Sequence, residues 1–253
     1  MKILYNINLV LLILFIGCTK TPKELYELSE ANLRNNKADL AIKDLNKLVK
    51  NYPNDSLASK AQYKLVSVHL NWKNDPARGY LELGNTVKNY PDTKQGIEAK
   101  RDIEQFPEYI LNKTESLRKK KQHKDALNHL MFMLDTYPNL DLSSKAQYML
   151  GDIYMNDFRD FKTAIQEYRK VITNFGKSEQ EPHALFMIGY IYANIMNDNK
   201  SALVEYQQFL ERFPNHELAP SVEFEIKYLG KSIEEIPALK HTIHTLDIQN
   251  LKL

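Results

Sequence analysis

Hydrophobic, small and aromatic residues recur along this chain with a long and regular period. An aromatic residue followed by proline or glycine stands at Tyr52-Pro53, Tyr90-Pro91, Tyr137-Pro138, Phe175-Gly176 and Phe213-Pro214. The steps from Pro53 to Pro91, from Pro138 to Gly176 and from Gly176 to Pro214 are equal in length, and only the step from Pro91 to Pro138 is longer. Because the spacing is kept over five periods with this one insertion, the sequence predicts an internal repeat.

Each period predicts two helices that lie against each other. In the fourth period Ala146, Leu150 and Ile153 recur at helical spacing, and Ile165 follows in a second helix after Asp160, which favours a helix start. Small or short residues hold two fixed places in each period, twelve residues before and eight after the proline or glycine. They are Ala41, Gly79, Ala126, Ala164 and Ala202, and then Ala61, Ala99, Ala146, Ala184 and Val222. Since one helix pair cannot bury both of its faces, we expect the pairs to stack into a solenoid.

The fourth and fifth periods resemble tetratricopeptide repeats. The run Ala146-x-Tyr148-x-Leu150-Gly151-x-x-Tyr154 carries the resemblance, and Ile188-Gly189 with Tyr192 repeats it. The resemblance covers roughly residues 24–229 and implies an all-α, right-handed superhelical solenoid of tetratricopeptide-like helix pairs. We expect about five pairs, followed by a final helix over residues 217–229. Over residues 92–122, where Phe106-Pro107 interrupts the pattern, we expect the first helix of the third pair to be stretched or doubled.

The amino terminus has a different character. Its apolar stretch, continuous from Leu9 to Ile16, is too short to span a bilayer and is typical of a secretory signal. The run Leu14-Phe15-Ile16-Gly17-Cys18 resembles the lipobox of bacterial lipoproteins, which implies cleavage before Cys18 and lipidation of that residue. The alternative is a plain signal peptide with an incidental cysteine. Thr19, in place of the aspartate of inner-membrane lipoproteins, favours the outer membrane, with the domain facing the periplasm.

These patterns divide the chain into four segments. Residues 1–17 are the expected lipoprotein signal peptide, residues 18–23 the lipidated tether, residues 24–230 the solenoid, and residues 231–253 a carboxy-terminal cap or tail. The last segment has apolar residues without a firm period. We expect it to cover the end of the solenoid, because solenoid ends need covering, and a partner-binding peptide is the alternative.

Composition and motifs exclude several kinds of chemistry. With 34 Lys and Arg against 32 Asp and Glu, the net charge of +2 gives no field that favours nucleic acid. A single cysteine excludes a disulfide framework, and His241-x-x-His244 lacks the carboxylate that would complete a metal site. No phosphate loop or nucleophile motif is present, so we expect no enzyme, no cofactor and no metal. The densest basic cluster, Arg118 to Lys121 with Lys124, is either a solvated helix end or a contact for anionic lipid or an acidic partner.

The resemblance to tetratricopeptide proteins also implies where a partner would bind. In that family the first helices of successive pairs line a concave face that holds a segment of another protein. With Leu150-Gly151 and Ile188-Gly189 as landmarks, the groove residues are Lys60, Tyr63, Ser67 and Leu70, then Lys145, Tyr148, Asp152 and Met155, and then His183, Phe186, Tyr190 and Ala193. Tyr63, Tyr148 and Phe186 hold equivalent places, either as aromatic anchors for a partner or as packing between helices.

The combination of lipobox and five long-period pairs is similar to the BamD family, the lipoprotein partners of the outer-membrane β-barrel assembly machine. This similarity implies a non-catalytic scaffold of the bacterial envelope that binds other proteins, with barrel-assembly components as candidates. A second interpretation is similarity to the CpoB family of periplasmic repeat adaptors, which coordinate envelope constriction with wall synthesis. A cell-wall enzyme is the third, and it would need a sheltered catalytic carboxylate.

Overall fold

The computed structural model describes residues 20–232 and Glu235, and every regular element among them is a helix. The chain divides after Tyr109 into two compact units. The predicted signal peptide, Cys18 and most of the predicted tail lie outside the described residues. Within the described part, no helix combines the length and the apolar character that crossing a bilayer requires.

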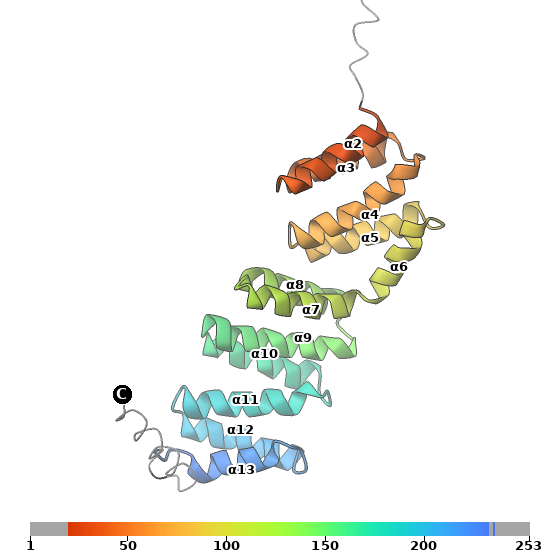
Figure 1. Cartoon of the computed structure of the whole chain (residues 1–253). Helices are drawn as coiled ribbons and strands as arrows, with labels where there is room; N and C mark the ends of the chain where they lie inside the picture. Colours follow the sequence, from red (N-terminus) through yellow and green to blue (C-terminus); the bar gives the residue numbers. More distant parts are fainter. Residues whose placement is uncertain (1–19, 233–234, 236–253) are drawn as a thin grey trace, which may run out of the picture. The chain divides into compact units, whose positions relative to one another are not determined.

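The first unit consists of two helix pairs and the start of a third. Its helices are α2 (Pro22–Arg34), α3 (Ala38–Asn51), α4 (Ser56–Asn71), α5 (Pro76–Asn89), α6 (Lys94–Glu104) and the beginning of α7 (Phe106–Lys119). Figure 1 shows α2 lying along α3 and α4 lying along α5, as the repeat predicts.

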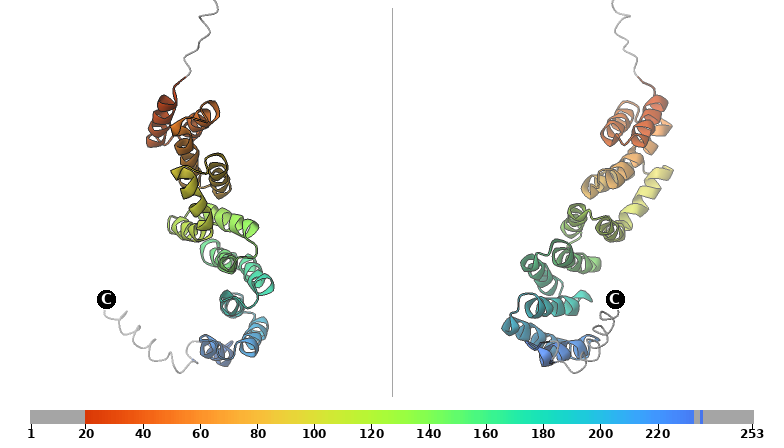
Figure 2. Two further views of the ribbon diagram at one scale, coloured as in Figure 1. Left: turned by 90° about the vertical axis from the view of Figure 1, so that its right-hand side faces the viewer. Right: turned by 60° about the vertical axis from the view of Figure 1, so that its left-hand side comes forward.

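The second unit continues the same alternation. After the rest of α7 it contains α8 (His123–Thr136), α9 (Asp141–Asp152), the π-helix η1 (Ile153–Phe158), α10 (Phe161–Asn174), α11 (Gln180–Asn194), α12 (Asn199–Arg212) and α13 (Ala219–Tyr228). Helix α9 packs against α10, α10 against α11, and α11 against α12, so the pairs of this unit are stacked in chain order (Figure 2). The all-α solenoid of tetratricopeptide-like pairs is thereby confirmed within each unit.

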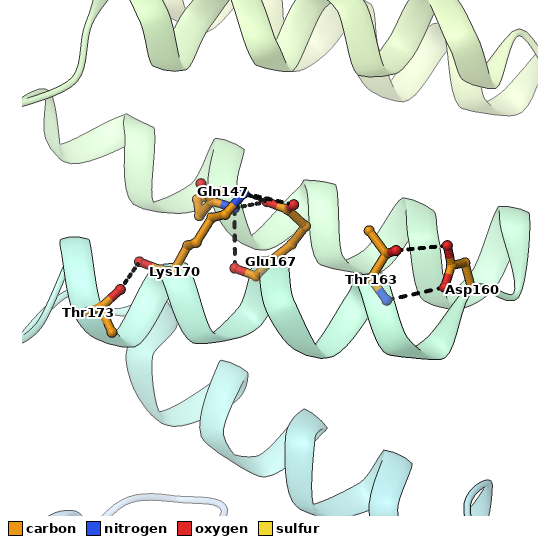
Figure 3. A network of polar contacts seen from close by, with 6 residues as sticks. All are labelled: Gln147, Asp160, Thr163, Glu167, Lys170 and Thr173. Atoms are coloured by element: carbon orange, nitrogen blue, oxygen red, sulfur yellow. Dashed lines mark hydrogen bonds and ion pairs between the residues drawn. The ribbon is translucent and has the colours of Figure 1, made fainter.

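Side-chain caps fix where several helices begin. Thr21 and Glu24 form a reciprocal capping box, so α2 begins at Pro22, inside the segment predicted as tether. Asp160 accepts a hydrogen bond from the backbone N–H of Thr163, as its position before α10 predicts (Figure 3). The insertion resolves into two helices: α6 ends at Glu104, and α7 begins at Phe106 with Pro107 in its first turn, where the missing amide costs nothing. The expected stretched or doubled helix is therefore doubled.

The small residues of the repeat lie where helices meet. All eight repeat alanines and Val222 are fully buried. The two helices of a pair also approach closely at Gly151 and Gly189, where an added Cβ would lie 2.5 Å from ring atoms of Tyr168 and Tyr206 respectively. A tyrosine of the second helix thus packs directly onto the glycine backbone of the first helix in both pairs.

Polar links between the helices of a pair also repeat. The amide of Gln147 on α9 donates to the carboxylate of Glu167 on α10 at 2.7 Å (Figure 3), and Gln62 donates in the same way to Glu82. Gln62 and Gln147 belong to the two copies of the tetrapeptide Lys-Ala-Gln-Tyr, which begin at Lys60 and Lys145. The same tetrapeptide therefore makes the same interhelical hydrogen bond in both units.

Candidate functional site

The groove residues predicted on α4 lie between neighbouring first helices of the first unit. Lys64 forms an ion pair with Glu30 on α2 at 2.8 Å, and the Tyr63 hydroxyl donates to the Asp102 carboxylate on α6 at 2.5 Å. These contacts place α2, α4 and α6 side by side. Tyr63 and Ser67 are half-buried, whereas Leu70 is buried. The predicted row of first helices is thus present in this unit, but Leu70, one of the predicted groove residues, is buried and not exposed to the groove.

In the second unit the predicted groove residues form a half-buried aromatic row. The ring of Tyr148 on α9 lies 6.3 Å from His183 on α11 and 5.2 Å from Tyr168 on α10. Phe186 lies 6.3 Å from Tyr190 and 6.2 Å from Tyr206. Tyr148 and Phe186 therefore pack against the second helix of their pair and also keep part of their surface exposed. Packing between helices and exposure to a partner, the two interpretations left open for these residues, are therefore compatible.

Asp152, another predicted groove residue, is held by the same packing. The Tyr168 hydroxyl donates to Asp152 at 2.7 Å, and burial raises the pKa of the Asp152 carboxyl while this hydrogen bond and Arg118 oppose the rise. The segment that follows, η1, is a π-helix, and Met155 lies in it 3.8 Å from the same hydroxyl. Lys145 and Ala193 lie on the first helices α9 and α11, and Lys60 on α4, as predicted.

A cavity of about 290 Å³ opens in the first unit beside three of the four predicted groove residues of α4. Its lining consists of Tyr63, Val66, Ser67, Leu70, Asn71, Leu83, Asp102, Gln105, Phe106 and Tyr109. The walls are mainly aliphatic and aromatic, and the hydrogen-bonded Tyr63 and Asp102 supply polar groups. The predicted groove residues Tyr63, Ser67 and Leu70 are thereby brought together around one space.

The repeat explains why a cavity forms at this place. When the two copies of Lys-Ala-Gln-Tyr are aligned, Val66 and Leu83 fall on Gly151 and Tyr168, the glycine and tyrosine that pack together in the second unit. With leucine at position 83, no phenol ring extends toward Ser67, the counterpart of Asp152. The Tyr109 hydroxyl in the lining is buried without a hydrogen-bond partner, and burial raises the pKa of Tyr109 to about 12.

Sequence reasoning missed aromatic residues in both units. Phe224 and Tyr228 on α13 stand one repeat period after Phe186 and Tyr190, so the same period would have identified them. Their rings lie 4.7 Å apart, and Phe224 is 39% exposed. Phe106 and Tyr109 gave no such signal, because the insertion interrupts the period before them.

The basic cluster is divided by its contacts. Arg118 forms an ion pair with Asp157 at 2.8 Å, whereas Lys119, Lys120 and Lys121 lie at the end of α7 without an ion pair of this kind, and Lys120 and Lys121 are exposed. Among the described residues, no group of three or more His, Cys, Asp or Glu side chains is arranged to hold a metal ion. His241 and His244 lie outside these residues.

Comparisons with known families match two parts of the chain. The family described as outer membrane lipoprotein, YfiO, matches residues 18–158, which is more than half of the chain. The tetratricopeptide repeat family matches residues 145–178 and 183–216, the two pairs in which the sequence pattern is clearest. A comparison with curated protein sequences finds no match.

Solved structures of repeat proteins are also similar to this chain. MamA from Desulfovibrio magneticus RS-1, from residue 41 to its end, is 18% identical over 79% of this chain and 99% of its own, with a TM-score of 0.35. A thermophilic tetratricopeptide-repeat protein of Thermus thermophilus is 17% identical over 81% of this chain and 97% of its own, with a TM-score of 0.33.

Proposed function

Because this chain belongs to the YfiO family of outer membrane lipoproteins, we propose that it is a lipid-anchored, non-catalytic scaffold that binds other proteins during outer-membrane protein assembly. This match confirms the resemblance to BamD-like envelope lipoproteins with tetratricopeptide repeats. Membership in this family indicates the cell envelope, and the tetratricopeptide repeats indicate protein–protein interaction. The role in outer-membrane protein assembly, the lipid anchor and the location of that anchor in the outer membrane are our proposal.

Two facts support the lipid anchor. The family match begins at Cys18, the residue that the lipobox marks for acylation, and Cys18 is the only cysteine of the chain. Acyl chains contribute about 0.8 kcal/mol per buried CH₂ group, so several chains on this residue hold a protein stably on a membrane. We place the anchor in the outer membrane and the helical units in the periplasm.

The observation that carries the binding proposal is the cavity beside α4. Its aliphatic and aromatic walls suit one apolar side chain of a partner, and the buried Tyr109 hydroxyl offers a hydrogen bond to a polar atom of the same segment. A buried hydroxyl without a partner costs free energy, so a ligand group that pairs with it gains affinity. Each unit also offers predicted groove residues on its own first helices, which are α4 in the first unit and α9 and α11 in the second.

Filling the cavity tests this assignment. Ser67→Phe places a ring in the cavity without removing a core side chain, and we expect it to reduce the capture of partners in a crosslinked pull-down from membranes. Asn46→Phe is the matched control, because Asn46 is exposed on α3, a second helix outside the predicted groove. Circular dichroism establishes that both variants keep their helical content. Equal capture of partners by the two variants would show that the cavity is not part of the binding surface.

The captured proteins test the assembly role. Barrel-assembly components are expected in the pull-down, and recovery of wall-synthesis or division proteins alone would contradict the proposal. Tyr148→Ala combined with Phe186→Ala probes the second unit in the same experiment. Each substitution leaves the glycine contacts of Tyr168 and Tyr206 in place. We expect weaker capture with a folded protein, because both rings contribute exposed aromatic surface.

A further inference from the structure

The chain enters the first unit at a fixed point. The Tyr52 hydroxyl, from the turn between α3 and α4, donates to the backbone carbonyl of Lys20 at 3.0 Å. One residue later, the Thr21 backbone N–H donates to the Glu24 carboxylate at 2.8 Å, and the Thr21 hydroxyl caps α2 in return. Lys20 is therefore held against one end of the first helix pair before α2 begins.

The remaining distance to the proposed anchor is short. Only Thr19 stands between Cys18 and Lys20, so their Cα atoms lie at most about 7 Å apart even in a fully extended chain. Acyl chains on Cys18 lie in the hydrocarbon of the bilayer, which places the backbone of Cys18 at the level of the headgroups. Lys20, and the turn held to it, must then lie at the bilayer surface.

The side chains at this end of the pair suit a phospholipid surface. Lys20, Lys23 and Lys50 are exposed. The nearby carboxylates are engaged by the protein itself: Glu24 in the capping box, Asp55 as acceptor from the Leu57 backbone N–H at 2.8 Å, and Glu27 in an exposed ion pair with Lys23 at 3.9 Å. Lysines near a membrane surface are attracted to anionic headgroups. The turn itself, Tyr52-Pro53-Asn54-Asp55, adds an aromatic residue of the kind that is enriched at membrane interfaces.

We propose that this end of the first unit, the tether edge formed by Lys20, Lys23, Lys50 and the turn 52–55, is a contact surface for the phospholipid headgroups of the membrane that holds the acyl chains. The inference rests on the proposed lipidation of Cys18 and adds an orientation to it. The turn between α2 and α3 lies at the opposite end of the same pair (Figure 1), about 20 Å away along the 13 residues of α2. One pair thus has a membrane end and a far end.

Fluorescent labels at the two ends test the orientation. In the acylated full-length protein Cys18 has no free thiol, so Asn54→Cys or Lys37→Cys introduces the only reactive one. Asn54 is exposed in the tether-edge turn, and Lys37 is exposed in the α2–α3 turn and makes no side-chain cap. Each labelled variant is bound to vesicles of phosphatidylethanolamine and phosphatidylglycerol that contain a spin-labelled headgroup lipid as quencher. We expect severalfold stronger quenching at position 54 than at position 37.

A longer tether is the second variant. About ten Gly and Ser residues inserted after Thr19 extend the reach to roughly 17 Å, and we expect quenching at position 54 to fall toward the value at position 37. Vesicle flotation and the intact mass report the acyl anchor separately. Equal or weaker quenching at position 54 in protein that floats and carries the acyl mass overturns the orientation alone. Protein without the acyl mass overturns the anchor itself and the orientation with it.

Discussion

At the scale of single residues, a glycine and a tyrosine set how closely the two helices of a pair approach. Gly151 and Gly189 present bare backbone to the rings of Tyr168 and Tyr206. The sequence pattern identified both glycines as landmarks of the repeat, but it did not show what they contact, because the tyrosines come from a different helix. In the first unit Val66 and Leu83 hold these two places, and a cavity is present there.

Gly189→Ala is expected to destabilise the protein by about 1–2 kcal/mol, because the new Cβ overlaps the Tyr206 ring and only part of this is offset by the better helix propensity of alanine. Gly84→Ala is the matched control. Gly84 also lies inside a helix, but a Cβ there meets no atom within 4 Å, so the variant is expected to gain about 0.5–1 kcal/mol. Urea unfolding followed by circular dichroism measures both. A gain of stability in Gly189→Ala would contradict the proposed contact.

Asp152→Asn tests the buried carboxyl. Its folded-state pKa is raised, so the folded protein binds more protons than the unfolded chain between the ordinary value of 3.8 and the raised value, and stability falls as pH rises through this window. The asparagine oxygen still accepts from the Tyr168 hydroxyl. We therefore expect Asp152→Asn to be more stable than the parent at pH 7 and the difference to vanish below pH 3.8. Thermal unfolding across pH measures this, with the exposed Asp135→Asn as control; a less stable Asp152→Asn at pH 7 would argue against it.

At the scale of elements, local signals fixed most helix boundaries. Prolines and aromatic residues marked the helix ends, and Asp160 was recognisable as a cap because Asp, Asn, Ser and Thr satisfy free amides at a helix start. The insertion was harder to interpret. Its length allowed one stretched helix or two. In the structure it forms two, and the second begins at Phe106, whose buried ring lies 5.1 Å from Tyr80 of α5. That contact lies outside the reach of any local pattern.

Asp160→Ala is expected to lower the melting temperature, because α10 loses the acceptor for the Thr163 amide, whereas Asp160→Asn keeps an acceptor and most of the stability. Hydrogen bonds from the Thr163 hydroxyl and amide lower the pKa of Asp160. Its contribution is therefore present above the ordinary pKa and lost as pH falls through the lowered value. Melting curves at several pH values should show the difference between the parent and Asp160→Ala shrinking on acidification. A constant difference would contradict a charge-dependent cap.

At the scale of the whole molecule, the last helix of the described residues, α13, departs from the repeat. Glu223 and Lys227 on α13 stand one repeat period after Leu185 and Gly189, which face α12 in the preceding pair. Both α13 side chains are exposed. Two charged side chains at the positions of Leu185 and Gly189 disfavour the close packing of another tyrosine-bearing helix, so this face of α13 is polar.

Removal of residues 236–253 tests whether the tail covers this end. The sequence favours a cap, but the charged residues on the outer face of α13 favour an end that needs no cover. We therefore expect the truncated protein to unfold within about 2 °C of the full chain, given that 1 kcal/mol shifts the melting temperature of a protein of this size by about 2–4 °C. Differential scanning calorimetry makes the measurement. A larger decrease would establish the tail as a cap, and an unchanged melting temperature with weaker partner capture would favour the partner-binding alternative.

The sequence by itself determined the helix pairs, their period, the small residues between them and the first helices on which a partner is expected to bind. These properties can be read from the sequence because each depends on residues close together in the chain, and the same pattern recurs in every period. The tertiary structure alone decided that the insertion is two helices, that Tyr63 meets Asp102, and that a cavity with the buried Tyr109 hydroxyl lies beside α4. These features depend on side chains from separate helices, where the local composition departs from the repeat and only packing determines what fills the space.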